Sequence, residues 1–393
     1  MTTRHIADVA AFSSRGALAA MISCHVAGLF FLPMMPLVMG AFVNDFSVQA
    51  LSLGSVASAQ LTTTALGAFS FTIIGSRTSC RRIVLAAIAC ELLLNAATLI
   101  SSSFTELIVL RGASGFAQGH LLAAAGACAA LSRRTEKTFA LYNATLATFA
   151  VVFLFVGALV VPLFGHAGVF ALFVVVDVLA LAFIYFGLPD FTLHARQASS
   201  SVRATPFTRS GGHAFIALIF FGVALSGTQT FIERLGYWHG AALDVVATSL
   251  GWGWCLAIVA PFMLIWLMGR CKDNLVLLLP AYALIAGLAI MLSLAQTTVV
   301  YLLAVALFTP LIMFIEPLQF GVLGQLDDTG RLAALGPGAI SIGSGLGPLT
   351  ISTVVNAFGL LSVGITAGCL LVLSLLFLYP VCTKANEKAL QKQ

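Results

Sequence analysis

The sequence predicts an all-α integral membrane protein with twelve transmembrane helices in two pseudo-symmetric six-helix bundles. Of the 393 residues, 60% are hydrophobic and only 8% are charged, whereas soluble proteins are about 25% charged. The mean hydropathy is +1.06. The apolar runs are long and do not alternate, which excludes the strands of an outer-membrane barrel. The sparse charge also excludes a disordered chain and a nucleic-acid-binding protein.

The apolar runs give the positions of the helices. A helix needs about 20 residues to cross about 30 Å of hydrocarbon. We expect spans at approximately 17–43, 48–74, 83–102, 107–131, 139–164, 167–188, 213–236, 245–268, 275–295, 299–324, 332–357 and 359–382.

The basic residues predict the orientation. Of the 19 Lys and Arg residues, 17 fall on the side of the membrane that both termini share. Arg234 lies on the opposite side and Arg111 lies within a span. Because Lys and Arg concentrate in cytoplasmic loops, we expect both termini in the cytoplasm and the protein in the inner (plasma) membrane.

The longest polar segment divides the chain into two halves. We predict a cytoplasmic N-terminus at 1–16, an N-terminal bundle at 17–188, a cytoplasmic linker at 189–212, a C-terminal bundle at 213–382 and a cytoplasmic tail at 383–393. The halves also echo each other, since GSRTSCRR follows the second span and MGRCKDN follows the eighth. Such repeats are typical of transporters whose site lies near the midplane.

Three short motifs add to this pattern. The loop after the second span resembles G-x-x-x-D-x-x-G-R-R, although it lacks the Asp and the second Gly. The fourth span matches R-x-x-x-G-x-x-x-G, and the eleventh span is rich in glycine. Their residues are Gly75, Arg81 and Arg82, then Arg111, Gly115 and Gly119, and finally Gly343, Gly345, Gly347 and Pro348.

With these motifs and its topology, the whole chain resembles the major facilitator superfamily. The resemblance implies a monomeric secondary transporter and places the fourth, seventh and tenth helices at a central cavity. The glycines of the fourth and eleventh spans, with Pro348, would let neighbouring helices pack closely. The fifth span lacks the G-P-x-x-G-G pattern of drug/proton antiporters, which weakens that assignment.

Ionisable residues within hydrocarbon cost about 2.5–3.5 kcal/mol on insertion scales, so each is a functional candidate. They are His25, Glu91, Arg111, His120, Asp177 and Glu316, with Asp45 and Glu233 near the outer ends.

Arg111 is the leading candidate. Ser114 and Gln118 follow it at i+3 and i+7, on the same helix face. Because the family resemblance places this helix at the cavity, we favour a cation that couples to protons or binds a substrate anion. The alternative is a structural Arg that pairs with Asp45 or Glu106, or reaches outward.

Two further helices carry candidates. Glu316 lies between two prolines with Gln319 on its face, and it is either a proton carrier or a paired Glu near the cytoplasmic end. Gln229 and Glu233 form a polar stripe in the seventh span. Alternatively, Glu233 is an outer residue paired with Arg234.

The remaining candidates stay open. His25 is a proton-exchanging group or, more commonly, a packing histidine. Glu91 and Asp177 are proton relays or structural carboxyls. His120 lies half a turn from Arg111, so we leave it out of the site. Aromatic residues of the eighth span form a substrate wall or only pack: Trp252, Trp254 and Phe262.

We therefore predict proton-coupled secondary transport of a small organic molecule by alternating access, with export of a lipophilic or aromatic compound favoured. Proton-coupled uptake of an organic acid held by Arg111 is the alternative, and a non-transporting receptor or intramembrane enzyme is a more remote one. No phosphate-binding loop is present, so ATP hydrolysis is not expected. The eight cysteines lack C-x-x-C spacing, and we expect no metal and no cofactor.

Overall fold

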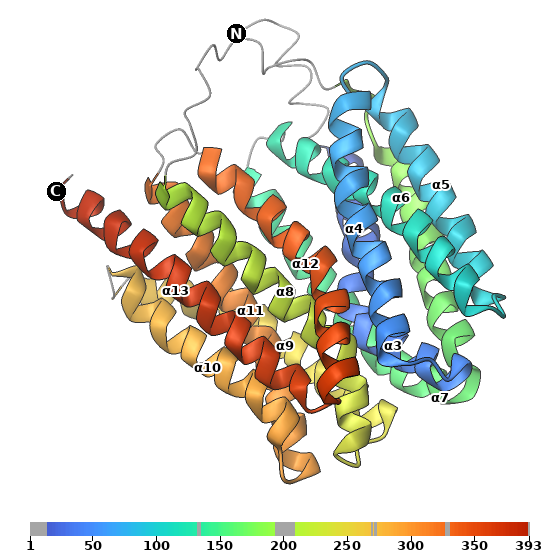
Figure 1. Ribbon diagram of the computed structural model, residues 1–393. Coiled ribbons are helices and arrows are strands. Elements are labelled where there is room, and N and C mark those ends of the chain that lie inside the picture. The colour runs from blue at the N-terminus through green and yellow to red at the C-terminus, as the bar shows by residue number, and fades with distance from the viewer. Residues whose placement is uncertain are drawn as a thin grey trace, which may run out of the picture. The chain divides into compact units, whose positions relative to one another are not determined.

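The protein is described by a computed structural model that covers residues 14–131, 135–192, 209–268, 270, 273–326 and 331–391. Within these ranges the chain forms helices and no strand (Figure 1). The helices are α2 Arg15–Leu29, α3 Phe31–Phe46, α4 Ala50–Ile74, α5 Cys80–Leu99, α6 Phe104–Leu131, α7 Thr135–Gly187, α8 Arg209–Trp238, α9 Leu243–Met268, α10 Asn274–Leu294, α11 Thr298–Leu326, α12 Arg331–Phe358 and α13 Ser362–Gln391.

Every predicted span falls on helical structure, and most coincide with a single helix. The first span is α2 and α3 together, and the fifth and sixth spans are the two parts of α7. Nine segments of the described chain are long and apolar enough to cross a membrane. The all-helical membrane fold is therefore confirmed, whereas the count of twelve crossings stays a prediction.

Two local interruptions have a chemical cause. The break between α2 and α3 falls at Phe30, three residues before Pro33. Proline has no N–H, so the carbonyl of Leu29 loses its helical donor there. In α7 the helix turns at Gly165, whose φ of 56° and ψ of −141° suit glycine alone.

The chain separates into two compact units. Unit 1 comprises Met1–Phe46 and Ala59–Val202, and unit 2 comprises Ser47–Ser58 and Arg203–Gln393. In unit 1, side chains from α2, α4, α5, α6 and α7 form a buried core that includes Cys24, Cys80 and Cys128. These three cysteines are free and contribute to this core as small buried side chains.

Glycines of unit 2 bring α8 and α12 into close contact (Figure 1). A Cβ atom at Gly343 would overlap the carbonyl oxygen of Ile219, and one at Gly347 would overlap the Ser226 hydroxyl. Pro348 lies within α12, directly after Gly347. The small residues thus allow the two backbones to approach closely.

The third predicted helix of each half is tied to the last helix of the same unit. In unit 1, the N-cap Ser79 of α5 donates to Asp190, and Arg81 donates to the Tyr185 carbonyl at 2.7 Å. In unit 2, the N-cap Asp273 of α10 accepts from Asn386 at 2.5 Å.

The loop Gly75–Arg82 therefore fastens α5 to the end of α7. Gly75 closes α4, because its N–H donates to the Phe71 carbonyl at 2.8 Å. The backbone N–H of Arg82 bonds to the Ser79 hydroxyl at 3.3 Å.

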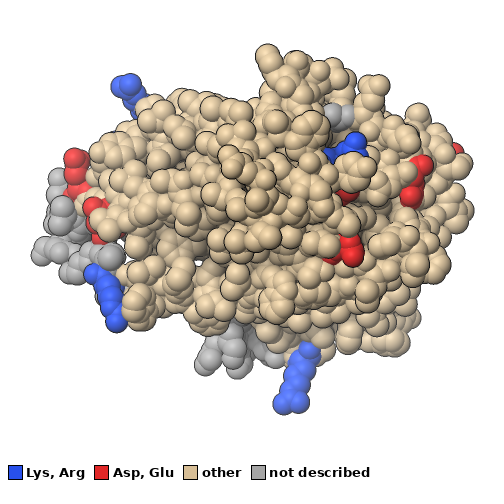
Figure 2. All heavy atoms as spheres, turned by 90° about the horizontal axis from the view of Figure 1, so that it is seen from below, with Lys and Arg blue, Asp and Glu red and all other residues tan. Residues whose placement is uncertain are grey.

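The outer surface suits a lipid environment. One face carries only scattered Lys, Arg, Asp and Glu residues (Figure 2). Large apolar side chains are exposed along the helices, among them Trp252 at 59% and Phe262 at 69%. Trp254 is buried, so these three aromatic residues do not share one environment.

Candidate functional site

Arg111 of α6 is fully buried inside unit 1. Its Nη1 donates to Asn95 Oδ1 at 2.8 Å and to Ser114 Oγ at 3.3 Å. Its Nη2 donates to Thr98 Oγ1 at 2.5 Å and to the Leu94 carbonyl at 3.2 Å. Both guanidinium ends are thereby held between α5 and α6, and the charge is fixed in place.

The ring of Phe170 covers the guanidinium. The Arg111 Cζ atom lies 4.5 Å from the ring centroid, which is within the range of a cation–π interaction. Phe170 belongs to α7, so three helices surround this side chain.

Glu91 of α5 is the second centre of the site and is also fully buried. Its Oε1 accepts from Ser114 Oγ at 2.8 Å, from Gln118 Nε2 at 2.9 Å and from Asn95 Nδ2 at 3.1 Å. Its Oε2 is buried without a hydrogen-bond partner. One oxygen is therefore saturated with donors, while the other is bare.

Asn95 joins Glu91 to Asp177 of α7. The same Nδ2 atom donates to Asp177 Oδ2 at 2.7 Å, so both amide hydrogens are used. Oδ1 of Asn95 accepts from Arg111. If the amide were flipped, its NH₂ group would face the Arg111 N–H donor and its oxygen would face the two carboxyl groups, so the observed orientation is the chemically consistent one. We call Glu91, Asn95, Arg111, Ser114 and Asp177 the charged cluster.

Glycines explain how α4 reaches the edge of this cluster. A Cβ atom at Gly115 would overlap the Gln60 carbonyl oxygen, and one at Gly119 would overlap that of Thr64. This close approach lets Gln60 Nε2 donate to Gln118 Oε1 at 3.0 Å. The glycines of α6 thus allow α4 to bring a further amide to the site.

The charged groups of the cluster contact one another only through neutral side chains. Among the described residues, no carboxylate oxygen lies within 4.0 Å of an Arg111 nitrogen. Asn95 and Ser114 lie between the guanidinium and Glu91, and Asn95 also lies between the guanidinium and Asp177. One cation and two carboxyl groups are buried together.

The structure brings together Arg111, Ser114 and Gln118, as their shared helix face predicts. Glu106 and Asp45, the two carboxylates considered as structural partners of Arg111, contact other residues instead. Glu106 accepts from Ser101 at 3.1 Å, and Asp45 binds His166.

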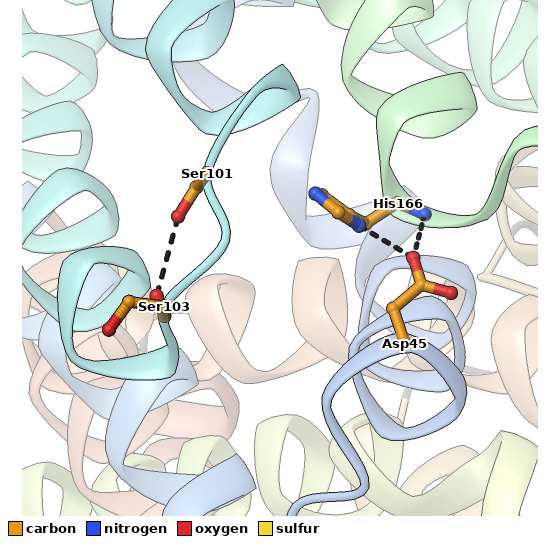
Figure 3. A network of polar contacts seen from close by, with 4 residues as sticks. All are labelled: Asp45, Ser101, Ser103 and His166. Atoms are coloured by element: carbon orange, nitrogen blue, oxygen red, sulfur yellow. Dashed lines mark hydrogen bonds and ion pairs between the residues drawn. The ribbon is translucent and has the colours of Figure 1, made fainter.

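Asp45 lies where α7 turns, at the end of unit 1 that also carries Ser101 and Ser103 (Figure 3). Its Oδ2 accepts from the His166 backbone N–H at 2.6 Å and contacts His166 Nδ1 at 2.5 Å. A Cβ atom at Gly165 would lie 2.6 Å from Asp45 Oδ1, so the carboxylate occupies the space that glycine leaves. Asp45 thus stabilises a turn and does not join the charged cluster.

Glu316 and Gln319 of α11 differ in their surroundings. Gln319 is fully buried and donates to the Tyr282 hydroxyl. That hydroxyl lies 2.9 Å from Ser374 Oγ, which donates to the Ala217 carbonyl at 2.7 Å. Glu316 is half-buried and makes no hydrogen bond with the residues described. Gln319 therefore links α11 to α10, whereas the carboxyl group of Glu316 is not engaged by another described side chain.

Gln229 and Glu233 are both buried in α8. Within the described part of the chain, Glu233 forms no ion pair with Arg234, whose guanidinium lies 5.8 Å from the Tyr237 ring centroid. Glu233 Oε2 has no hydrogen-bond partner. The alternative, in which Glu233 is an outer residue paired with Arg234, is therefore not observed in this structure.

His25 is buried and packs against an aromatic ring. Its ring stacks on Tyr142 of α7, with centroids 4.8 Å apart and planes at 24°. His120 contacts Ser70 Oγ at 2.9 Å and the Phe116 carbonyl at 2.8 Å, away from Arg111.

Sequence reasoning left Glu91 and Asp177 unassigned and missed Asn95, Thr98 and Gln60. One signal was readable. Glu91, Asn95 and Thr98 are spaced i, i+4 and i+7, which places three polar groups on one face of an apolar helix.

No protein-family model and no curated protein sequence matches the chain. Solved structures do resemble it. A crystal structure of the nucleoside transporter NupG superposes with a TM-score of 0.71 and 14% identity, over 93% of this chain and 99% of the other. A mutant of NupG gives 0.70 and 14%, over 92% and 98%.

This likeness establishes the fold. The chain is an all-helical, multi-pass membrane protein with the fold seen in the NupG structures. Membership of the major facilitator superfamily stays a prediction, since no family model matches.

Proposed function

We propose that this protein is a secondary active transporter that moves a small organic molecule across the inner membrane, driven by protons. The observation that carries the proposal is the fold, which it shares over nearly its whole length with a nucleoside transporter. In such a protein, two helical halves expose a site to one side of the membrane at a time.

The substrate class we propose is a neutral, lipophilic or aromatic small molecule. The similar solved structures are of a nucleoside transporter. Nucleosides are neutral and carry an aromatic base, so a nucleoside is the first probe that we would use. The rival proposal, uptake of an organic acid, depends on Arg111 as the carboxylate ligand. In this structure the two terminal nitrogens of Arg111 already make four hydrogen bonds, and its Nε has no partner but is buried. A carboxylate would have to displace these partners, which makes this proposal the weaker one.

Proton coupling is supported by the ionisable groups within the helices. Glu91, Asp177 and Glu233 are buried, and Glu316 is half-buried. Carboxyl groups at membrane depth are expensive, and proton relays are a common reason for their presence. The sequence has no nucleotide-binding loop that would supply energy instead.

The proposed topology places both termini and the 189–212 loop in the cytoplasm. It depends on the 17 basic residues that share one side. We propose export as the working direction and a monomer as the working unit.

Flux in proteoliposomes tests this function. The purified full-length protein is reconstituted, and the probe is radiolabelled uridine or radiolabelled chloramphenicol, a neutral aromatic compound, under an imposed pH gradient and without ATP. We expect protein-dependent flux of at least one probe, which the gradient accelerates and a protonophore abolishes. Flux that persists with the protonophore in sodium-free buffer would contradict proton coupling, and no flux of either probe would favour a non-transporting receptor.

A further inference from the structure

The charged cluster has a feature that the proposed fold does not require. Two carboxyl groups and one guanidinium are buried together: Glu91 and Arg111 are 0% exposed, and Asp177 is 2% exposed. With both carboxyls ionised, the cluster would carry one net negative charge within the membrane. An uncompensated charge in such surroundings is strongly unfavourable.

The geometry couples the two carboxyl groups to each other. Glu91 Oε1 and Asp177 Oδ2 accept from the same Asn95 nitrogen, at 3.1 and 2.7 Å. The two oxygens are therefore about 6 Å apart or closer, a range at which like charges repel strongly in a low dielectric. The ionisation of one carboxyl group disfavours that of the other.

The unpaired oxygen of Glu91 is a second observation, independent of the net charge, that points to a bound proton. Glu91 Oε2 is fully buried and no group donates to it. Buried carboxylate oxygens normally have donors. A proton on this carboxyl group, or on Asp177, would bring the cluster to zero net charge without any movement of the helices.

Among the residues that the structure describes, no further charged group faces the cluster. Arg111 on α6, Glu91 on α5 and Asp177 on α7 act on one another, and α4 contributes the neutral amide of Gln60. From α2, which packs on α6 and α7, the titratable His25 stacks instead on Tyr142.

We propose that the charged cluster is the proton-binding site of the transporter, where Glu91 and Asp177 share a single proton across Asn95. Arg111 is the fixed counter-charge, held by neutral groups and covered by Phe170. Proton binding converts one carboxylate to a carboxyl group, and release of the proton to water on the other side of the membrane restores the carboxylate. The role as the coupling site depends on the proposed function, whereas the shared proton does not.

Infrared spectroscopy of the purified full-length protein in liposomes tests the shared proton without any substrate. A protonated carboxyl group has a C=O band that is distinct from the carboxylate bands and shifts in deuterium oxide. We expect this band at pH 7 in the wild type. Glu91→Gln and Asp177→Asn should each remove it, because the one remaining carboxylate then balances Arg111 and stays ionised.

Two matched variants control for other carboxyl groups in the membrane. Glu233→Gln and Glu316→Gln should leave the cluster's band in place. Elution as a single species confirms that each variant is folded. If neither cluster variant folds, carboxyl-¹³C aspartate or glutamate incorporated into the wild type should shift the same band.

The outcomes separate this inference from the proposed function. A band that survives unchanged in both cluster variants, or that is absent from the wild type, overturns the shared proton. A band that behaves as expected, in a protein whose flux ignores the pH gradient, contradicts the coupling while the binding site stands. Gradient-driven flux with an unchanged band in both variants places the coupling elsewhere.

Discussion

Two equivalent helix interfaces of this protein use different chemistry. In unit 1, α5, α6 and α7 meet through Glu91, Arg111 and Asp177. In unit 2, α10, α11 and α13 meet through Tyr282, Gln319 and Ser374, which are all neutral. The equivalence is visible in the caps, since α5 and α10 each begin with a side chain tied to the end of the last helix.

The comparison shows what packing requires. Neutral hydroxyl and amide groups are enough to join three helices in unit 2, and interhelical hydrogen bonds of this kind are common in membranes. Buried charges add desolvation cost and are weak evidence for stability. The charges of unit 1 therefore exceed what the interface needs, and function is the reason we give for them.

The largest expected effect comes from Arg111→Lys. Lysine keeps the charge but cannot reach the four acceptors that the two guanidinium ends hold. Each buried acceptor that loses its donor in this way costs about 1–3 kcal/mol. We expect initial flux, measured at matched membrane expression, to fall nearly as far as in Arg111→Ala. A fully active Lys variant would show that the positive charge at this position is sufficient and that the guanidinium fork is not required.

Converting the charged interface into a neutral one sharpens the comparison. The triple variant Glu91→Gln, Arg111→Gln and Asp177→Asn removes all three charges while it keeps the polar groups. We expect a folded protein that still exchanges substrate but no longer responds to a pH gradient. Exchange flux and gradient-driven flux are measured in the same liposomes. Intact gradient-driven accumulation would show that the charges are dispensable.

Gly115→Leu tests the close approach of α4 to the cluster. The new side chain would overlap the Gln60 carbonyl, and overpacking of this kind costs about 1–3 kcal/mol. We expect a lower midpoint of thermal unfolding in detergent and weaker flux. Gly126→Leu on the same helix is the matched control, because a Cβ atom there meets nothing within 4 Å. Equal effects of the two changes would contradict a specific contact.

Tyr282→Phe is expected to have the smallest effect. It removes the hydroxyl that Gln319 and Ser374 contact, and leaving such a buried group unpaired costs about 1–3 kcal/mol. Thermal unfolding should shift modestly, while the response to a pH gradient stays as in the wild type. A loss of coupling with unchanged stability would assign a transport role to unit 2.

The sequence predicts the helices better than their rotation about their axes. The run lengths predict where the helices lie, although not how many times the chain crosses the membrane, and the spacing of Arg111, Ser114 and Gln118 predicts their shared face. The contacts of Asp177 with Asn95, or of Asp45 with His166, join segments far apart in the chain. Such pairings depend on how α3, α5 and α7 pack, which no local pattern encodes.

The most direct test of the central claim compares Glu91→Gln with Glu316→Gln in proteoliposomes. The quantity measured is the ratio of flux with an imposed pH gradient to exchange flux without one. If unit 1 carries the coupling proton, Glu91→Gln keeps exchange but its ratio falls to one, whereas Glu316→Gln keeps the wild-type ratio. A wild-type ratio in Glu91→Gln, together with loss of the gradient effect in Glu316→Gln, would contradict this account and move the coupling site to unit 2.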